Sequence, residues 1–298
     1  AAIYRRAHSP GRRLHGDLRG IRDNPSTANG RMRSVDTPYK VFVHHSQWAD
    51  FEGRAGEHNR FLSGNRTFSM VVPLEMGWRH LLFENWPVDP EVVDAHLPAG
   101  LEPDTYDGAA WLSVVPYTNV EVRPKGLPRQ LGIRLPELNL RTYVTRDDVP
   151  SVYFFSLDAQ GAISVLGARL FQHLPYYYAR IALDWADGRI QFRSRRLHPG
   201  DRPARYEASY WPTGEPFAAP EDPFASFLVE RYRFYTQAPD GSIRYTDVGH
   251  EPWTLYPAAA DVETNTLLEA NGFAEPDAEP VYYYSPGVDV VASRSQQP

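Results

Sequence analysis

One short segment carries the residue types best suited to binding and catalysis. Within 137–144, Glu137, Asn139 and Arg141 fall on one face of an extended chain, and apolar side chains fall on the other. A carboxylate, an amide and a guanidinium that project together can bind a polar ligand, with Arg141 holding a carboxylate group. The alternatives are that this face is solvated, or that Glu137 and Arg141 form a structural ion pair. We predict Glu137 as a catalytic residue, and Asn139 and Arg141 as ligand-binding residues.

Arg169 and two tyrosines are further candidates. Arg169 interrupts an apolar segment, and a buried arginine needs an anionic partner, which is either Glu137 or an anionic ligand. Tyr176 and Tyr177 are predicted as catalytic residues because a phenol can donate to a developing oxyanion or shuttle a proton. The alternative is that their rings pack and their hydroxyls are satisfied structurally. Alternation sends Tyr176 and Tyr177 to opposite faces of a strand.

His250, two residues before Pro252-Trp253, completes the set of catalytic candidates. Histidine titrates near neutrality and is a natural acid–base group, and the alternative is a structural role at a turn. No His-Glu-x-x-His or similar spacing occurs, so no metal site is expected. No glycine-rich phosphate loop occurs either, and no cofactor is expected.

Strand signals dominate the scaffold that must position these residues. Asp107-Gly108 and Asp187-Gly188 are hairpin-type turns between aromatic and β-branched segments. Asp89-Pro90 predicts a short helix to about His96, and Asp222-Pro223 predicts a longer helix over 223–236. Many short strands with few helices favour a barrel or sandwich. The expected strands are 78–86, 111–117, 137–145, 151–157, 164–171, 177–185, 188–196, 204–211, 243–247 and 281–293.

Charge divides the chain near residue 70. Residues 1–69 hold 12 Lys+Arg against 6 Asp+Glu, whereas the remainder holds 19 against 31. The first part lacks hydrophobic periodicity, which predicts disorder. It is either sequence upstream of a true start at Met70 or a basic arm that binds nucleic acid. The acidic remainder, 70–298, is expected to be a single domain that does not bind nucleic acid.

Composition limits the classes of function. Of the 31 basic residues, only Lys40 and Lys125 are lysines, which fits either a halophilic origin or the arginine-rich codon usage of a high-GC genome. The absence of cysteine excludes disulfides, thiolate catalysis and Cys-ligated metal sites. No secretory signal and no apolar run of 18 residues occur, which predicts a cytoplasmic protein without a membrane span.

Several local patterns, occurring in order along 70–298, together resemble the YqjF-like family of uncharacterised proteins. That family is similar to the acetoacetate-decarboxylase-like superfamily, and the resemblance implies a mainly β fold with a β-barrel around a central cavity. The patterns that carry it are Pro136-Glu137-Leu138-Asn139-Leu140-Arg141-Thr142-Tyr143-Val144, Tyr153-Phe154-Phe155-Ser156-Leu157-Asp158-Ala159, Ala168-Arg169 with Leu174-Pro175-Tyr176-Tyr177, Phe227-Leu228-x-Glu230-Arg231-Tyr232-x-x-Tyr235, and His250-x-Pro252-Trp253.

The resemblance does not extend to the catalytic lysines. The decarboxylases resembled here use a Schiff-base lysine beside a second lysine, in the pattern Gly-Arg-Glu, a short gap, then Pro-Lys-Lys. In this chain Arg169 and Pro175 match, but Leu170 replaces the glutamate. Tyr176 and Tyr177 replace the lysines, and a phenol cannot form an imine. Two functions remain: a lysine-independent enzyme acting on small carboxylates or keto compounds, and a non-catalytic barrel that binds a small anionic ligand.

Overall fold

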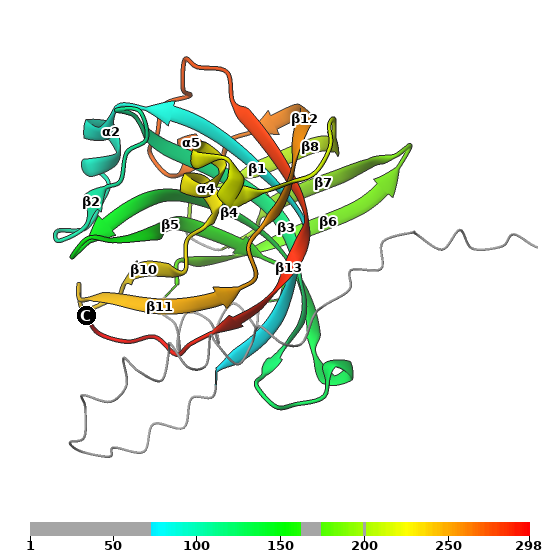
Figure 1. Cartoon of the computed structure of the whole chain (residues 1–298), viewed down its shortest axis with the longest axis horizontal. Coiled ribbons are helices and arrows are strands. Elements are labelled where there is room, and N and C mark those ends of the chain that lie inside the picture. The colour runs from blue at the N-terminus through cyan, green and yellow to red at the C-terminus, as the bar shows by residue number, and fades with distance from the viewer. Residues whose placement is uncertain (1–72, 162–173, 199–200) are drawn as a thin grey trace, which may run out of the picture. The chain divides into compact units, whose positions relative to one another are not determined.

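The computed structural model describes residues 73–161, 174–198 and 201–298 as a mainly β fold (Figure 1). The predictions made for 1–69, for the strand at 164–171 and for Arg169 lie outside the described residues. The strands are β1 (Leu74–Val88), β2 (Glu102–Pro103), β3 (Ala110–Pro124), β4 (Ile133–Arg146), β5 (Val149–Ala159), β6 (Tyr176–Ala186), β7 (Arg189–Arg196), β8 (Arg205–Pro212), β9 (Phe217–Ala218), β10 (Arg233–Gln237), β11 (Ile243–His250), β12 (Thr254–Asn265) and β13 (Val281–Ala292). The α-helices are α2 (Pro90–Asp94), α4 (Pro223–Val229) and α5 (Leu267–Ala270), and the 3₁₀ turns are η2 (Arg129–Leu131) and η3 (Ala219–Glu221).

The strands form one sheet that closes on itself. Its order is β2-β4-β3-β1-β13-β11-β10-β5-β6-β7-β8-β12-β9, and two further pairings join β4 to β5 and β12 to β13. These pairings create two circuits that share β1, β3, β4, β5 and β13. We call the circuit completed by β10 and β11 the α4 barrel, and the circuit completed by β6, β7, β8 and β12 the β6–β8 barrel. The β-barrel expected from the sequence is confirmed.

The shared strands separate two apolar cores. On β1, Leu82 belongs to the core of the β6–β8 barrel, together with Phe192 and Tyr206. Its neighbour Phe83 belongs to the core of the α4 barrel, where Leu228 of α4 packs. Successive side chains on a strand point to opposite faces, so strands buried on both sides supply residues to both cores.

Local sequence signals fix the turns and the first helix. Asp107 and Gly108 have φ values of 52° and 78°, and Asp187 and Gly188 have 53° and 76°. Two successive residues with positive φ are the requirement of a type I′ hairpin turn, and Asp-Gly meets it. Asp89 caps α2, since its side chain accepts a hydrogen bond of 2.9 Å from the backbone N–H of Glu91.

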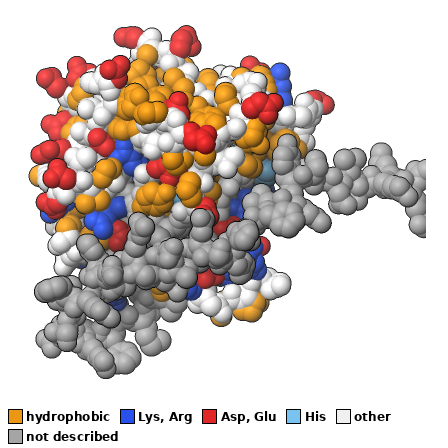
Figure 2. Space-filling view, viewed as in Figure 1, with side chains coloured by type: hydrophobic (Ala, Val, Ile, Leu, Met, Phe, Trp, Pro, Cys, Tyr) orange, Lys and Arg blue, Asp and Glu red, His pale blue; other side chains and the backbone are white. Residues whose placement is uncertain are grey.

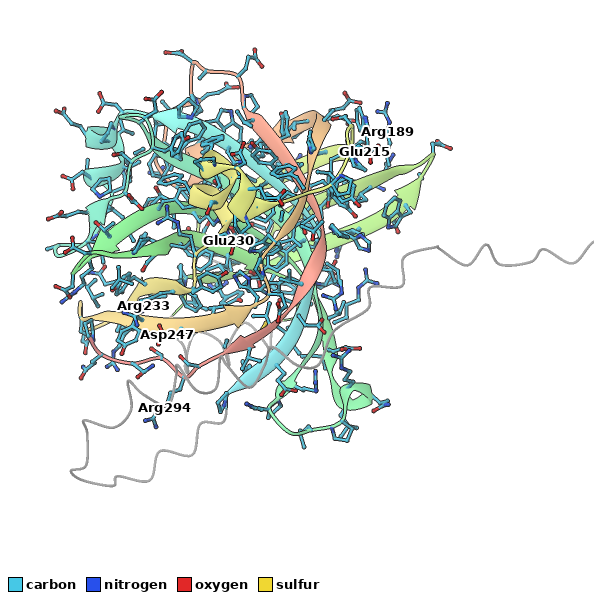
Figure 3. The ribbon with its side chains drawn as sticks, viewed as in Figure 1. Arg189, Glu215, Glu230, Arg233, Asp247 and Arg294 are labelled. Carbon is cyan, nitrogen blue, oxygen red and sulfur yellow. The ribbon has the colours of Figure 1, made fainter. Side chains whose placement is uncertain are left out.

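The longer helix predicted over 223–236 is wrong in its second half. Asp222 caps α4 as expected, but the helix ends at Val229 because Glu230 leaves helical geometry with φ −82° and ψ 63°. Residues 233–237 form β10, which pairs with β11 and β5 and so closes the α4 barrel. Arg233 and Asp247, which lie side by side in Figure 3, pair across β10 and β11 at 2.7 Å. Strand pairing here overrides a helical apolar pattern.

β12 was not predicted from the sequence, although it is one of the strands that close the β6–β8 barrel. Its segment includes Pro257 and a run of alanines, both weak strand formers. Among the helices in the described part of the chain, none has the length and apolar character needed to cross a membrane.

Candidate functional site

The polar face of β4 points into the α4 barrel. Glu137 and Asn139 are each 2% exposed, so the alternative of a solvated face is wrong. On the opposite face, Leu138 and Leu140 pack in the core of the β6–β8 barrel, which fixes the orientation of the strand. Glu137 lies directly opposite Tyr117 of β3 in the antiparallel register. The alternation of side-chain type along β4 therefore places a carboxyl group inside a barrel.

The Glu137 carboxyl is bound by neutral donors. The Tyr117 hydroxyl donates to Oε1, the Tyr176 hydroxyl donates to Oε2 at 2.9 Å, and Asn119 Nδ2 donates to Oε2 at 3.0 Å. Burial raises the pKa of Glu137 to about 7, although the three hydrogen bonds act in the opposite direction. Burial and the adjacent Glu137 also hold the pKa values of the Tyr117 and Tyr176 phenols well above their usual range. The carboxyl therefore titrates near neutrality while both phenols keep their protons.

Several buried polar atoms of the α4 barrel have no hydrogen-bond partner among the described residues. They include Asn119 Oδ1, Asn139 Oδ1, Arg141 Nε and Trp253 Nε1. Buried polar atoms in folded proteins are nearly always hydrogen-bonded, to protein or to ordered water. Two acceptors and two donors in one barrel core are therefore suited to a small polar molecule.

Arg141 differs from the neighbouring Arg231 in its charge balance. Both guanidinium groups lie near the ring of Tyr143, at 5.7 Å and 5.3 Å from its centroid. Arg231 is ion-paired with Asp104, whereas Arg141 Nη2 donates to the backbone oxygen of Leu228 at 3.2 Å. Within the described residues, Arg141 forms no ion pair, with Glu137 or with any other acid. It is a cation without a charged partner, as an anion-binding group should be.

The structure does not bring Tyr177 and His250 to the Glu137 carboxyl. Tyr177 points to the opposite face from Tyr176, as alternation predicts, and its ring lies 4.0 Å from the Arg196 guanidinium. His250 Nδ1 donates to the backbone oxygen of Glu251 at 2.8 Å, and its ring stacks on Tyr232. Burial lowers the pKa of His250, so it is neutral at physiological pH.

His250 reaches the Glu137 cluster only through an intervening indole. The Trp78 ring centroid is 6.3 Å from that of His250 and 6.0 Å from that of Tyr117. This geometry gives His250 the role of an aromatic packing partner beside the site. Arg169, the third ligand-binding candidate, lies outside the described residues.

A second buried carboxyl, Glu84, was not predicted from the sequence. It is 2% exposed in the β6–β8 barrel, and the Tyr206 hydroxyl donates to its Oε2 at 3.0 Å. The Tyr282 hydroxyl is 3.5 Å from Oε1. Burial raises the pKa of Glu84 to about 8. The sequence contains the signal, because Glu84 lies between Leu82 and Trp86 on one face of an apolar strand.

Two sequence comparisons match this chain to uncharacterised proteins. Residues 75–289 match the family DUF2071, described as an uncharacterised conserved protein. The uncharacterised protein YqjF of Bacillus subtilis (strain 168) is 42% identical over 215 residues, which cover 72% of this chain and 88% of YqjF.

Solved structures show the same fold at low sequence identity. The enduracididine biosynthesis enzyme MppR complexed with pyruvate has a TM-score of 0.55 at 14% identity, covering 79% of this chain and 93% of MppR. Acetoacetate decarboxylase from Legionella pneumophila has a TM-score of 0.52 at 11% identity, covering 82% of this chain and 95% of that enzyme. The fold expected from the sequence is thus confirmed, and at these identities the likeness concerns the fold alone.

Proposed function

The chain belongs to the DUF2071 family of uncharacterised conserved proteins, and we propose that it binds a small carboxylate or keto compound in the α4 barrel. Glu137 moves a proton on that compound without a lysine. The observation that carries this proposal is the Glu137 carboxyl, which is buried between two phenols and has a pKa of about 7. A general base works best when its pKa lies near the operating pH.

The hydrogen bonds of Glu137 suggest how the proton moves. At neutral pH a large fraction of Glu137 is ionised, and the Tyr176 hydroxyl donates to its Oε2. When that hydroxyl rotates toward a ligand carbonyl oxygen, Oε2 still accepts from Asn119 Nδ2 but has a lone pair available to accept a proton. The C–H bond next to the carbonyl then breaks, its proton goes to Glu137, and its electrons form an enolate that Tyr176 stabilises by hydrogen bonding. Reversal of these steps returns a proton from Glu137 to carbon.

Arg141 supplies the anchor for the carboxylate end of the ligand. Arg141 and Glu137 are four residues apart on β4, so their Cα atoms are roughly 13 Å apart along the strand. The two side chains span much of that separation when they lean toward Asn139 between them. A molecule of a few carbon atoms with one carboxylate end therefore suits the site better than a bulky substrate does. The fold relative MppR was solved with pyruvate, a keto acid of this size.

The test is exchange of pyruvate methyl hydrogens for deuterium, followed by ¹H NMR in D₂O with the whole chain. We expect exchange above the buffer rate, which Glu137→Gln abolishes because an amide cannot accept the proton. Tyr177→Phe is the matched control, since Tyr177 faces away from Glu137 and its loss should leave the rate unchanged.

The alternative is a non-catalytic barrel that binds a small anionic ligand, and the same samples distinguish it. Thermal stabilisation by pyruvate that Arg141→Gln removes, without any exchange, would establish binding without catalysis. Absence of both exchange and stabilisation, across a series of small keto acids and carboxylates, would contradict the proposed function.

A further inference from the structure

A pocket of about 570 Å³ lies beside Glu84, in a part of the molecule that the proposed function does not use. It is bordered by β1, β12, β13, α5 and the loop that precedes β13. Volumes of about 300–1,000 Å³ are usual for sites that bind small molecules. The pocket is therefore large enough for a compact organic ligand.

Among the described residues, the ionisable side chains that line this pocket are acidic. Glu84 lies at its buried end, and the exposed carboxylates at its rim are Glu263, Glu269, Glu275, Asp277 and Glu279. No lysine or arginine is among the described residues that line it. Figure 2 shows acidic side chains along the upper edge of the view, where Figure 1 places the loop before β13. A cleft lined by one sign of charge concentrates ligands of the opposite sign.

The buried carboxyl distinguishes this pocket from an acidic patch on a surface. Glu84 is 2% exposed, and its only described hydrogen-bond partners are the phenols of Tyr206 and Tyr282. Its Oε1 has a single contact, at 3.5 Å, which is at the limit of a hydrogen bond. A carboxyl that faces a pocket and has no positive partner is suited to a cationic group that enters from solvent.

Aromatic rings supply the apolar part of the pocket. Trp86, Phe273 and Tyr282 line it together with the carboxylates. Rings of this kind bury the apolar stem of a ligand and also attract a cation through their faces. The lining thus combines an acidic end with an apolar wall, which fits a cation that carries a short hydrocarbon chain. Glu84, whose pKa is about 8, keeps its proton up to about that pH when no ligand is bound, and it binds such a cation in its ionised form.

The arrangement favours an ammonium group over a guanidinium or a metal ion. A guanidinium forms two parallel hydrogen bonds and needs both oxygens of a carboxylate as acceptors. Tyr206 already donates to Oε2 of Glu84, which leaves only Oε1 for a ligand. A compact ammonium can bind Oε1 alone and direct its other donors outward. A metal ion would need several converging ligands, and no group of three or more His, Asp or Glu suited to a metal exists among the described residues.

We propose that this pocket binds a small primary ammonium compound, with the charged end at Glu84 and the hydrocarbon stem among Trp86, Phe273 and Tyr282. The site is separate from the Glu137 site, because Glu84 and Glu137 lie in different barrels. Ligands of the two sites differ in the sign of their charge, so each site can be tested while the other is left intact.

The test is calorimetric titration of the whole chain with butylammonium chloride, with 1-butanol and sodium butyrate as neutral and anionic analogues at matched ionic strength. At a pH of about 9, where Glu84 is ionised, we expect butylammonium to bind at least about tenfold more tightly than either analogue, because only it forms a charge-assisted hydrogen bond with the carboxylate. Glu84→Gln should weaken its binding by about tenfold, whereas Glu137→Gln should leave it unchanged.

Two substitutions at exposed residues keep the test decisive even if Glu84→Gln does not fold. Ala278→Arg places a positive charge at the rim, and Ala186→Arg places the same charge on the β6–β7 hairpin, away from the pocket. We expect Ala278→Arg to weaken butylammonium binding about threefold and Ala186→Arg to have no effect. Equal binding of butylammonium and 1-butanol, equal affinities in both arginine variants, or displacement by magnesium or calcium ions would overturn the proposal.

Discussion

Glu137 and Glu84 are chemically similar sites in different surroundings. Each is a buried glutamate that accepts hydrogen bonds from two tyrosines, one in the α4 barrel and one in the β6–β8 barrel. Near Glu137, Arg141 lies on the same strand, and several buried polar atoms have no described partner. Near Glu84, a pocket with an acidic rim is open to solvent. Burial raises the pKa of both carboxyls against the opposing effect of the tyrosine hydrogen bonds, and the surrounding charge decides which ligand each site suits.

A third buried acid, Asp158, differs from the two glutamates because an arginine is its partner. Its Oδ1 accepts a hydrogen bond from Arg196 Nε at 2.8 Å and forms an ion pair with Arg196 Nη2, and both side chains are almost fully buried. We expect Arg196→Met to reduce the free energy of unfolding by about 3–5 kcal/mol at pH 8, because it leaves the Asp158 carboxyl without its partner. Urea unfolding at pH 5 and pH 8 measures this, and the loss should be smaller at pH 5, where Asp158 is protonated. A loss that does not vary with pH would instead indicate lost packing of Arg196 on Tyr177.

Glu84→Gln should change the pH dependence of the free energy of unfolding more than Glu137→Gln does. The folded state holds the Glu84 proton up to about pH 8, whereas the reference pKa of the group is 4.5. The stability that protonated Glu84 provides is complete below pH 4.5 and is lost as pH rises to 8. Relative to wild type, the variant should therefore gain about 5 kcal/mol across this window. Denaturant unfolding at a series of pH values measures this gain. If Glu84 were not buried as a neutral acid, the difference in free energy of unfolding between variant and wild type would not change with pH.

Glu137→Gln should produce the same effect over a narrower window. The pKa of Glu137 is raised to about 7, so the relative gain should develop between pH 4.5 and 7 and then level off. We expect a gain of about 3 kcal/mol in the free energy of unfolding, measured by the same unfolding series. Asn119 can rotate its amide to accept from the new Gln amide, which keeps the site satisfied. A gain that continues above pH 7 would show that the two sites do not differ in pKa.

The two phenols of the Glu84 site should contribute unequally. Tyr206 donates at 3.0 Å, whereas Tyr282 is at 3.5 Å. Both hydrogen bonds lower the pKa of Glu84, so removing either hydroxyl raises it. Tyr206→Phe should destabilise the protein by about 1 kcal/mol at pH 7, and Tyr282→Phe by less than about 0.5 kcal/mol. Thermal unfolding of the two variants at several pH values compares them, and equal effects would contradict the geometry.

The sequence predicted the local features of the fold better than the closure of the sheet into two barrels. Alternation identified the polar face of β4, and Asp107-Gly108 and Asp187-Gly188 form the tight turns that their residue types require. The ring closures depend on contacts between strands that are distant in sequence, such as β5 with β10, and no local pattern encodes them. The same contacts explain why residues 233–237 form a strand instead of continuing α4.

The candidate site was only partly predictable for the same reason. Glu137 and Tyr176 were each proposed from residue type, but their hydrogen bond joins β4 to β6 across strand β5. Arg141 was expected to face a cavity, yet only the fold shows that Asp104 balances Arg231 and that no acid in the described part of the chain pairs with Arg141. Glu84 was not predicted because it belongs to no motif. Only the two-residue alternation of side chains along the strand indicates that it is buried.

The most direct test of the account is an NMR titration of the protein with ¹³C-labelled glutamate side chains, in the presence of pyruvate or butylammonium. We predict two carboxyl resonances that titrate near pH 7 and pH 8 and disappear in Glu137→Gln and Glu84→Gln, respectively. Pyruvate should shift only the first resonance, and butylammonium should shift only the second. Two carboxyls that titrate near pH 4.5, or a single resonance that responds to both ligands, would contradict the existence of two sites with opposite charge preference.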